Sequence, residues 1–317
     1  MKYNKLGNSG LKVSKLSFGS WLTFGAKLDI KKANECIRCA YDNGINSFDN
    51  AEVYGDGISE SIMGQAIKEF RRESIVVSTK IFWSGQGPND IGLSRKHLFE
   101  ATHNSLKRLD LKYVDLLYCH RPDPDTPIVE TVRAMSDLIT QGYAFYWGTS
   151  EWSACQIEEA YRWAEKLNCI PPTMEQPEYN LFKKKRVENE YMPLYEKFKL
   201  GTTTWSPLAF GILSGKYNNE IPKESRLSLH PEWRKDDLFK KIEVVKLLEP
   251  IAQELNCTLS QFSIAWCMKN PNVSSVILGS SNVEQLNENI KSLDVVDKLT
   301  DEVMLKVNSI LDSTWHE

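Results

Sequence analysis

The chain has 317 residues, 41% of them hydrophobic, and it carries a formal net charge of −3 with a pI near 6.1. Such a length can bury the core of one large α/β domain or of two ordinary domains. The weak negative charge argues against a nucleic-acid-binding surface, and no apolar run approaches the roughly 18 residues of a membrane-spanning helix.

The N-terminal segment, residues 1–15, predicts a β-hairpin with its turn at Asn8, Ser9 and Gly10. The first ten residues contain no apolar stretch of the kind that forms a secretory signal peptide. The cysteines number seven and are spread over the whole chain, which is typical of a reducing compartment rather than of a disulfide-built fold. We therefore expect a cytoplasmic protein.

Cys36 and Cys39 form a lone CxxC pair, with no second pair to complete a metal site. Both lie in a segment whose apolar residues, among them Ala33 and Ala40, recur at helical spacing. We therefore interpret the two cysteines as part of a buried helix face rather than as zinc ligands or a redox pair.

From residue 16 onward, short β-rich segments alternate with amphipathic helical segments. The strands are predicted at residues 16–20, 45–49, 75–80, 114–120, 144–150, 172–176, 201–206 and 274–280. The helical pattern is clearest over 97–110, where Leu98, Ala101, Leu106 and Leu109 share one face with Thr102 and Ser105.

Eight strands, each followed by a helix, predict a closed (β/α)8 barrel over the whole chain, residues 1–317. The main alternative is a doubly wound open sheet, which usually has a GxGxxG turn after its first strand, and this sequence contains no such turn. Residues 210–237, after the seventh barrel strand, show no sustained period and predict a long functional loop that packs through apolar residues such as Ile212, Leu213, Tyr217 and Leu229.

Polar and aromatic residues lie at the carboxyl ends of the predicted strands, which converge on the mouth of such a barrel. They are Ser20, Trp21, Asp49, Lys80, Cys119, His120, Ser150, Gln176, Trp205, Ser206 and the run from Gly279 to Ser281. Loop polarity alone explains the serines one by one. It explains the set poorly, because an Asp, a Lys and a His fall together with the nearby Tyr54.

These four side chains are suited to protonating a carbonyl oxygen. A tyrosine of ordinary pKa is a weak acid at neutral pH, and a neighbouring Lys80 ammonium is expected to lower the pKa of Tyr54. Asp49 is expected to keep Lys80 charged, and His120 to bond a substrate oxygen or join the proton relay. With no nucleophile–base pair among them, an attacking hydride has to come from a cofactor.

We expect no metal. His120, Asp123 and Asp125 are close in sequence, but the prolines between them in "HRPDPDTP" suit a rigid turn better than a set of ligands.

Phosphate binding is suggested near the last two strands, where barrels often hold it. Lys216 and Arg226 supply positive charge there, and Ser281 with Glu284 has the spacing of a helix-capping box. That helix start is either an ordinary cap or an anion site.

Taken in order along the chain, these segments resemble the aldo-keto reductases. The similarity runs from about residue 5 to about 293, and it is strongest in the branch that contains the β subunits of voltage-gated potassium channels. The matching segments are "LGNSGLKVSKLSFGSW", "FDNAEVYG", "VVSTK", "DLLYCHRPD", "WGTSEWS", "EQPEYN", "TTWSPLAFGILSGKY" and "VILGSSNVEQLNENI".

The resemblance implies a barrel that binds NADPH without a Rossmann motif and reduces a carbonyl substrate. It implies a catalytic tetrad in which Tyr54 is the general acid, Lys80 and Asp49 tune it, and His120 orients the carbonyl. The implied cofactor-binding residues are Ser20, Trp21, Ser150, Gln176, Trp205, Ser206, Pro207, Leu208, Ala209, Gly211, Lys216, Arg226, Gly279, Ser281, Gln285, Glu288 and Asn289.

Two residues depart from the channel subunits. Several of those subunits have Asn at the position of His120, so the His here favours catalysis, and Glu151 stands where they often have Arg. The resemblance also implies an alternative function as a channel β subunit, with bound NADPH as a redox sensor and a tetrameric assembly. Trp21, Phe24 and Trp83 are expected to shape the substrate pocket.

Overall fold

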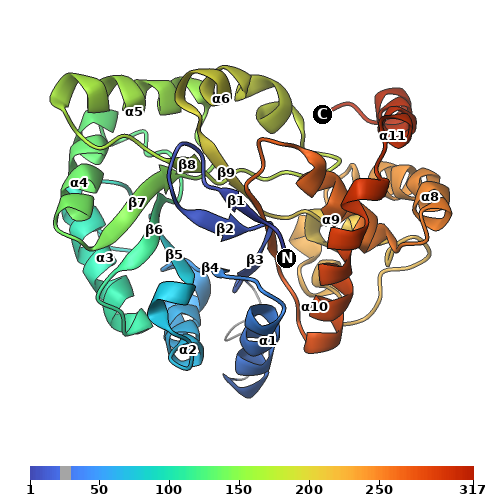
Figure 1. Cartoon of the computed structure of the whole chain (residues 1–317), viewed down its shortest axis with the longest axis horizontal. Helices are drawn as coiled ribbons and strands as arrows, with labels where there is room; N and C mark the ends of the chain where they lie inside the picture. Colours follow the sequence, from blue (N-terminus) through green and yellow to red (C-terminus); the bar gives the residue numbers. More distant parts are fainter. Residues whose placement is uncertain (22–29) are drawn as a thin grey trace.

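The computed structural model describes residues 1–21 and 30–317, so Phe24 lies outside the described residues. Eight parallel strands close into a barrel in the order β10-β3-β4-β5-β6-β7-β8-β9, as the sequence predicts (Figure 1). The strands are β3 (Leu16–Gly19), β4 (Ser47–Asp49), β5 (Val76–Ile81), β6 (Val114–Cys119), β7 (Ala144–Thr149), β8 (Met174–Glu175), β9 (Gly201–Thr204) and β10 (Ser275–Leu278).

The predicted N-terminal hairpin is also present and covers the amino-terminal end of the barrel. Strand β1 (Tyr3–Lys5) pairs antiparallel with β2 (Lys12–Ser14). Leu6 and Val13 pack against Val76, Leu116 and Met174 inside the barrel. This end is therefore filled by apolar side chains, and the opposite, carboxyl-terminal end is left for a site.

Helices surround the barrel (Figure 1). They are α1 (Ile30–Asp42), α2 (Ile58–Ile67), α3 (Arg95–Leu109), α4 (Ile128–Thr140), α5 (Ala154–Leu167), α6 (Met192–Phe198), α7 (Arg226–Leu229), α8 (Leu238–Glu254), α9 (Leu259–Lys269), α10 (Val283–Ile290) and α11 (Asp301–Thr314). Helices α8 and α11 pack together outside the ring. None of the helices in the described ranges combines the length and apolar character needed to span a bilayer.

The helix faces follow the sequence pattern. All six residues that share the predicted face of 97–110 are buried in α3. In α1 the Cys36 thiol is buried, whereas Cys39 is only partly buried and donates to Asn287. The interpretation of a buried helix face is thus confirmed for Cys36 and only partly for Cys39.

Residues 210–237 are more ordered than a plain loop. They contain most of the short helical segment η4 (Ala209–Ser214), then α7, then the short turn η5 (Pro231–Trp233). Leu213, Tyr217 and Leu227 are buried, as expected of a packed segment. The expectation was wrong for Leu229, the last residue of α7, which is 48% exposed.

Candidate active site

A buried lysine lies at the centre of the barrel mouth. Lys80, near the end of β5, is fully buried, and its Nζ lies 2.5 Å from Asp49 Oδ2. The same ammonium donates to the Asn50 carbonyl at 2.8 Å and to the Tyr54 hydroxyl at 3.3 Å. Asp49, Lys80 and Tyr54, predicted from separate segments, therefore meet around one nitrogen.

The loop after β4 brings Tyr54 back to the lysine. The Glu52 N–H donates to the Lys80 carbonyl, which ties this loop to β5. Tyr54 begins the short helical turn η1 (Tyr54–Gly57), in which Gly55 and Gly57 have positive φ angles of 58° and 86°. Glycine adopts this left-handed conformation at little cost, so the chain can reverse within a few residues and keep the hydroxyl on Lys80.

The Asp49 carboxylate is held by donors from β5 and from the residue that follows β8. Its Oδ1 accepts from the Ser78 hydroxyl at 2.7 Å and from the Gln176 amide at 3.1 Å. Ser78 and Lys80 are two residues apart on β5, so their side chains point to the same side, into the barrel. Ser78 was not among the predicted site residues, although this period of two marks it as a neighbour of Lys80.

The electrostatics of Tyr54 differ from the sequence expectation. Burial raises the pKa of Tyr54, Lys80 opposes this shift and Asp49 adds to it, so the net pKa lies above its ordinary value. The prediction of a lowered pKa was wrong because it included the ammonium but not the desolvation of the phenolate. Burial by itself lowers the pKa of Lys80, but Asp49 and Tyr54 outweigh it, and the net pKa is raised.

His120 follows β6 and faces the same mouth. Its ring centroid lies 5.8 Å from that of Tyr54 and 5.2 Å from that of Trp83, with edge-on geometry in both cases. Burial holds the pKa of His120 well below its ordinary value, and the positive charges of Lys80 and Arg121 lower it further. The imidazole is therefore neutral at pH 7, and its buried Nδ1 has no hydrogen-bond partner among the described residues.

Other predicted residues line the mouth beside this cluster. The Ser20 hydroxyl donates to the Asp49 carbonyl at 3.1 Å. The Ser150 hydroxyl donates to the Gln176 carbonyl at 2.9 Å and accepts from Arg121 at 3.3 Å. Trp21 packs edge-on against Trp205, with ring centroids 6.1 Å apart.

The segment after β9 carries the next group of predicted residues. Pro207 and Ala209 are buried, and Trp205, Ser206 and Leu208 are partly exposed. Ser206, Ala209 and Gly211 all have positive φ, which is uncommon for the first two and marks a constrained backbone.

Two cations lie together in this segment. Lys216 packs its Nζ over Gly211, where a Cβ would stand 2.7 Å from that nitrogen. Arg226 lies over the Trp21 ring at 5.6 Å. Lys216 is exposed over its side chain as a whole. Burial around its ammonium lowers the pKa of Lys216, and repulsion by Arg226 adds to this shift. Burial also lowers the pKa of Arg226. Neither cation forms an ion pair with a described residue.

The start of α10 differs by one residue from the expectation. Asn282, not Ser281, is the N-cap, and its side chain accepts from the Gln285 N–H at 2.7 Å. Gln285 in turn accepts from the Ser281 N–H and hydroxyl, so Glu284 has no part in the cap. Around it, Gly279, Ser281, Gln285 and Glu288 are exposed, and Asn289 is buried.

Glu52 and Glu151, for which the sequence predicts no role, both make specific contacts in the structure. Glu52 is buried, accepts from the Phe82 N–H at 2.6 Å and lies 3.5 Å from His97 Nε2. It thus anchors the chain next to Trp83. Glu151 contacts Trp205, Glu178 and Arg186. Nothing in the sequence identifies these partners, because they come from separate loops.

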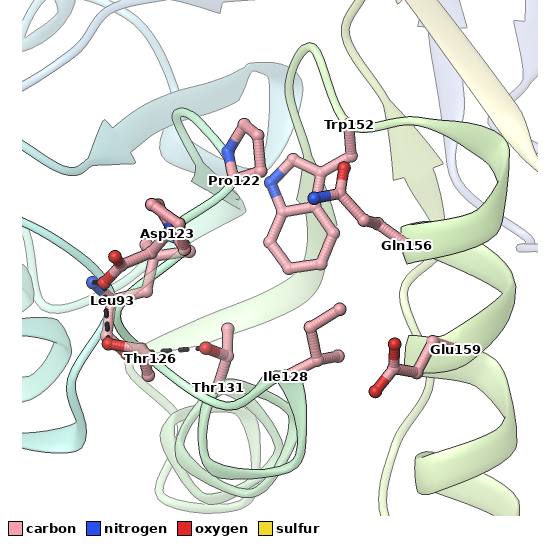
Figure 2. A pocket seen from close by; sticks show the side chains of 10 residues that line it. Leu93, Pro122, Asp123, Thr126, Ile128, Thr131, Trp152, Gln156 and Glu159 are labelled. Carbon is pink, nitrogen blue, oxygen red and sulfur yellow. Dashed lines mark hydrogen bonds between the residues drawn. The ribbon is translucent and has the colours of Figure 1, made fainter.

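A cavity of about 250 Å³ lies beside the mouth but contains none of the four clustered side chains (Figure 2). It lies among Leu93, the loop after β6, the start of α4 and the start of α5, with Trp152 over it. Asp123, on its wall, accepts from the Leu93 and Asp125 N–H groups and from Thr126. These bonds fix the loop, and the described residues contain no group of three side chains suited to a metal.

Glu175 carries a pH-dependent contribution to stability. Its carboxyl is buried on the outer side of β8, where Thr149 and Tyr191 donate to it. Burial raises its pKa to about 8 from an ordinary 4.5; Thr149 opposes the shift and Glu151 adds to it. The folded state therefore keeps a proton that the unfolded chain loses above pH 4.5, and stability falls as the pH rises towards about 8.

We expect Glu175→Gln to remove this pH dependence. The neutral amide matches the protonated acid, so the variant should melt several degrees above the wild type beyond pH 8 and differ little from it near pH 4.5. Melting curves recorded between pH 5 and 9 measure this difference. A variant whose melting temperature runs parallel to that of the wild type across this range would contradict the assignment.

The chain is similar to known proteins over nearly its whole length. The model of the aldo/keto reductase family matches residues 15–312. A protein of Arabidopsis thaliana named as a probable voltage-gated potassium channel subunit beta is 55% identical over 322 residues, which cover 99% of this chain and 97% of that protein. A protein of the same name from Oryza sativa subsp. japonica is 53% identical over 322 residues, with the same coverage.

Proposed function

The chain belongs to the aldo/keto reductase family, and on this premise we propose that it is an NADP(H)-dependent oxidoreductase that reduces aldehydes or ketones to alcohols. The observation that carries the proposal is the contact of the buried Lys80 ammonium with both Asp49 and Tyr54 at the mouth of the barrel. Such a pair can protonate an oxygen on which negative charge develops.

The raised pKa of Tyr54 fits this role. A phenol whose pKa lies above its ordinary value is protonated at neutral pH, so the Tyr54 hydroxyl carries the proton that it donates. The Lys80 ammonium, 3.3 Å away, stabilises the phenolate as the proton leaves. Asp49, with its bonds to Ser78 and Gln176, keeps that ammonium in place and charged.

His120 orients the substrate in this proposal. Because its pKa is depressed, the imidazole is neutral and acts as a hydrogen-bond donor to the carbonyl oxygen rather than as a cationic acid. Its position beside Tyr54 lets one oxygen face both side chains. Trp83 and Trp21 supply apolar surface around them, which suits many carbonyl substrates.

NADPH, when bound, supplies the hydride. The residues around the mouth fit such a group: Gln176 offers a polar amide beside Asp49, Ser150 offers a hydroxyl next to Gln176, and Trp205 offers a partly exposed aromatic face. Lys216 and Arg226, which form no ion pair with a carboxylate of the described residues, fit its phosphates. The proposed cofactor-binding set also contains Ser20, Trp21, Ser206, Pro207, Leu208, Ala209, Gly211, Gly279, Ser281, Gln285, Glu288 and Asn289.

The test of the proposal is direct. The purified protein is mixed with NADPH and an aromatic aldehyde, and cofactor oxidation is followed by absorbance. Continuous oxidation that depends on both protein and aldehyde supports a reductase. No turnover across a panel of aldehydes and ketones, by protein that binds NADPH, would overturn it.

We expect Arg226→Ala to reduce the preference for NADPH over NADH. Loss of a charge-assisted bond to the 2′-phosphate should weaken NADPH binding about ten-fold or more and leave NADH binding nearly unchanged. Dissociation constants measured by calorimetry with both cofactors give the ratio. Lys223→Ala, an exposed cation in the same segment, is the matched control. Equal weakening of both cofactors would contradict a phosphate-binding role.

A second candidate function is that of a β subunit of a voltage-gated potassium channel, located in the cytoplasm, with bound NADPH as a redox sensor. It is favoured by the names of the two plant relatives and by their identity to this chain over nearly its full length. It predicts a tetramer and co-purification with a channel cytoplasmic domain. A monomer by light scattering that captures no such domain would count against it, and the reductase proposal would be unaffected.

A further inference from the structure

Glu151, two residues after the end of β7, has an unusual backbone. Its φ is +62°, in the left-handed region that side-chain-bearing residues rarely adopt. Such a conformation persists where surrounding contacts enforce it, and it is often found at functional sites. The contacts of the Glu151 carboxylate show which groups this conformation brings together.

The carboxylate of Glu151 joins three loops. Its Oε1 accepts from the Glu178 N–H at 2.5 Å, in the loop after β8, and from the Trp205 indole N–H at 2.9 Å, directly after β9. Its Oε2 lies 2.6 Å from Arg186 Nη1. One side chain therefore fixes the indole of Trp205 relative to the ends of β7 and β8.

A carboxylate suits this position better than other side chains. It accepts several hydrogen bonds and donates none, and here every partner is an N–H donor. The surroundings are otherwise acidic, since Glu175 is adjacent and burial raises the pKa of Glu178. Arg186 supplies the compensating charge and also lies 3.5 Å from Glu190.

The rest of Trp205 is confined by aromatic rings. Trp21 meets it edge-on at 6.1 Å and Phe210 at 6.5 Å. The indole nevertheless stays partly exposed, so part of its surface is open. Ring packing limits where the indole lies, and the bond from Nε1 to Glu151 selects its rotation about the side-chain torsions.

We propose that Glu151 is a positioning residue that sets the plane of the Trp205 indole for contact with the nicotinamide ring. The inference rests on the proposed function, because it assumes that a nicotinamide cofactor occupies the mouth. A preset indole removes the need to order that side chain when the cofactor binds, and this increases affinity. Arg186 acts one step further out, by keeping the Glu151 carboxylate paired and aimed.

A double-mutant cycle tests the link. Dissociation constants for NADPH and NADP+ are measured by calorimetry for wild type, Glu151→Ala, Glu151→Gln, Trp205→Phe and the double variant Glu151→Ala/Trp205→Phe. We expect Glu151→Ala to weaken binding about ten-fold, which corresponds to the loss of one charge-assisted hydrogen bond. Glu151→Gln should recover most of the affinity, because its amide oxygen accepts the same two N–H groups.

The decisive measurement is the effect of Glu151→Ala in a protein that already lacks the indole N–H. In the Trp205→Phe background, Glu151→Ala should change affinity by no more than about two-fold, since the bond it removes is already absent. Glu158→Ala is the matched control, because Glu158 pairs with Lys197 on the outer surface of α5 and does not contact Trp205. Circular dichroism verifies that each variant is folded.

The outcomes separate the two proposals. Wild-type protein that binds neither NADPH nor NADP+ would overturn the proposed function and this inference with it. Wild-type protein that binds, combined with an undiminished effect of Glu151→Ala in the Trp205→Phe background, would overturn this inference alone. The same holds if Glu151→Gln binds as weakly as Glu151→Ala.

Discussion

Tyr54→Phe should lower the turnover of an aldehyde by about 10²- to 10⁴-fold, the usual contribution of a positioned acid. The substitution removes only the hydroxyl that Lys80 contacts at 3.3 Å. The ring remains in place over the Lys80 ammonium, 5.0 Å from the ring centroid, and beside His120. The affinity for NADPH should therefore stay within about two-fold of the wild-type value, as the phenol is not needed for cofactor contact.

Steady-state rates and a separate cofactor titration are both needed for this test. Tyr161→Phe is the matched control, because Tyr161 lies on α5 and stacks on Phe198 of α6, outside the barrel. That variant should retain full turnover. If Tyr54→Phe also retained it, the proton would have to come from another group, and the assignment of Tyr54 would be wrong.

The sequence was sufficient to predict the barrel and the convergence of its strand ends. Strand–helix alternation determines the topology, and in a parallel barrel the carboxyl ends of all strands meet at one mouth. The topology alone therefore predicts that Asp49, Lys80 and His120 lie close together. Tyr54 lies beyond its strand, so alternation alone does not place it. Its closeness to Asp49 in the sequence suggested it as the fourth member, and the resemblance implied its role as general acid.

The remaining features depend on three-dimensional contacts that have no local sequence signal. The pKa of Tyr54 depends on how much protein surrounds its hydroxyl, and burial reverses the direction expected from Lys80 alone. Glu151 acquires its contacts from Glu178, Arg186 and Trp205, which are 27, 35 and 54 residues away. The cap of α10 moved by one residue because Asn282 accepts the bond expected of Ser281. Both are good N-cap residues, so propensity does not separate them.

Lys80→Met should have the largest effect on stability among these substitutions. It leaves the Asp49 carboxylate buried with the Ser78 and Gln176 donors but without its counter-charge. Breaking one partner of a buried ion pair typically costs about 3–5 kcal/mol, because the remaining charge is uncompensated. Chemical denaturation of the wild type and the variant measures the difference in the free energy of unfolding.

A compensating variant separates the structural role of this pair from its catalytic role. Asn at position 49 carries no charge, so Asp49→Asn/Lys80→Met should regain most of the lost stability. It should not regain turnover, because no ammonium remains to stabilise the Tyr54 phenolate. A double variant as unstable as Lys80→Met would show that the cost arises from packing rather than from the unpaired charge. A double variant that regained turnover as well as stability would show that Lys80 is needed only to neutralise Asp49, and that the proton on Tyr54 can be transferred without it.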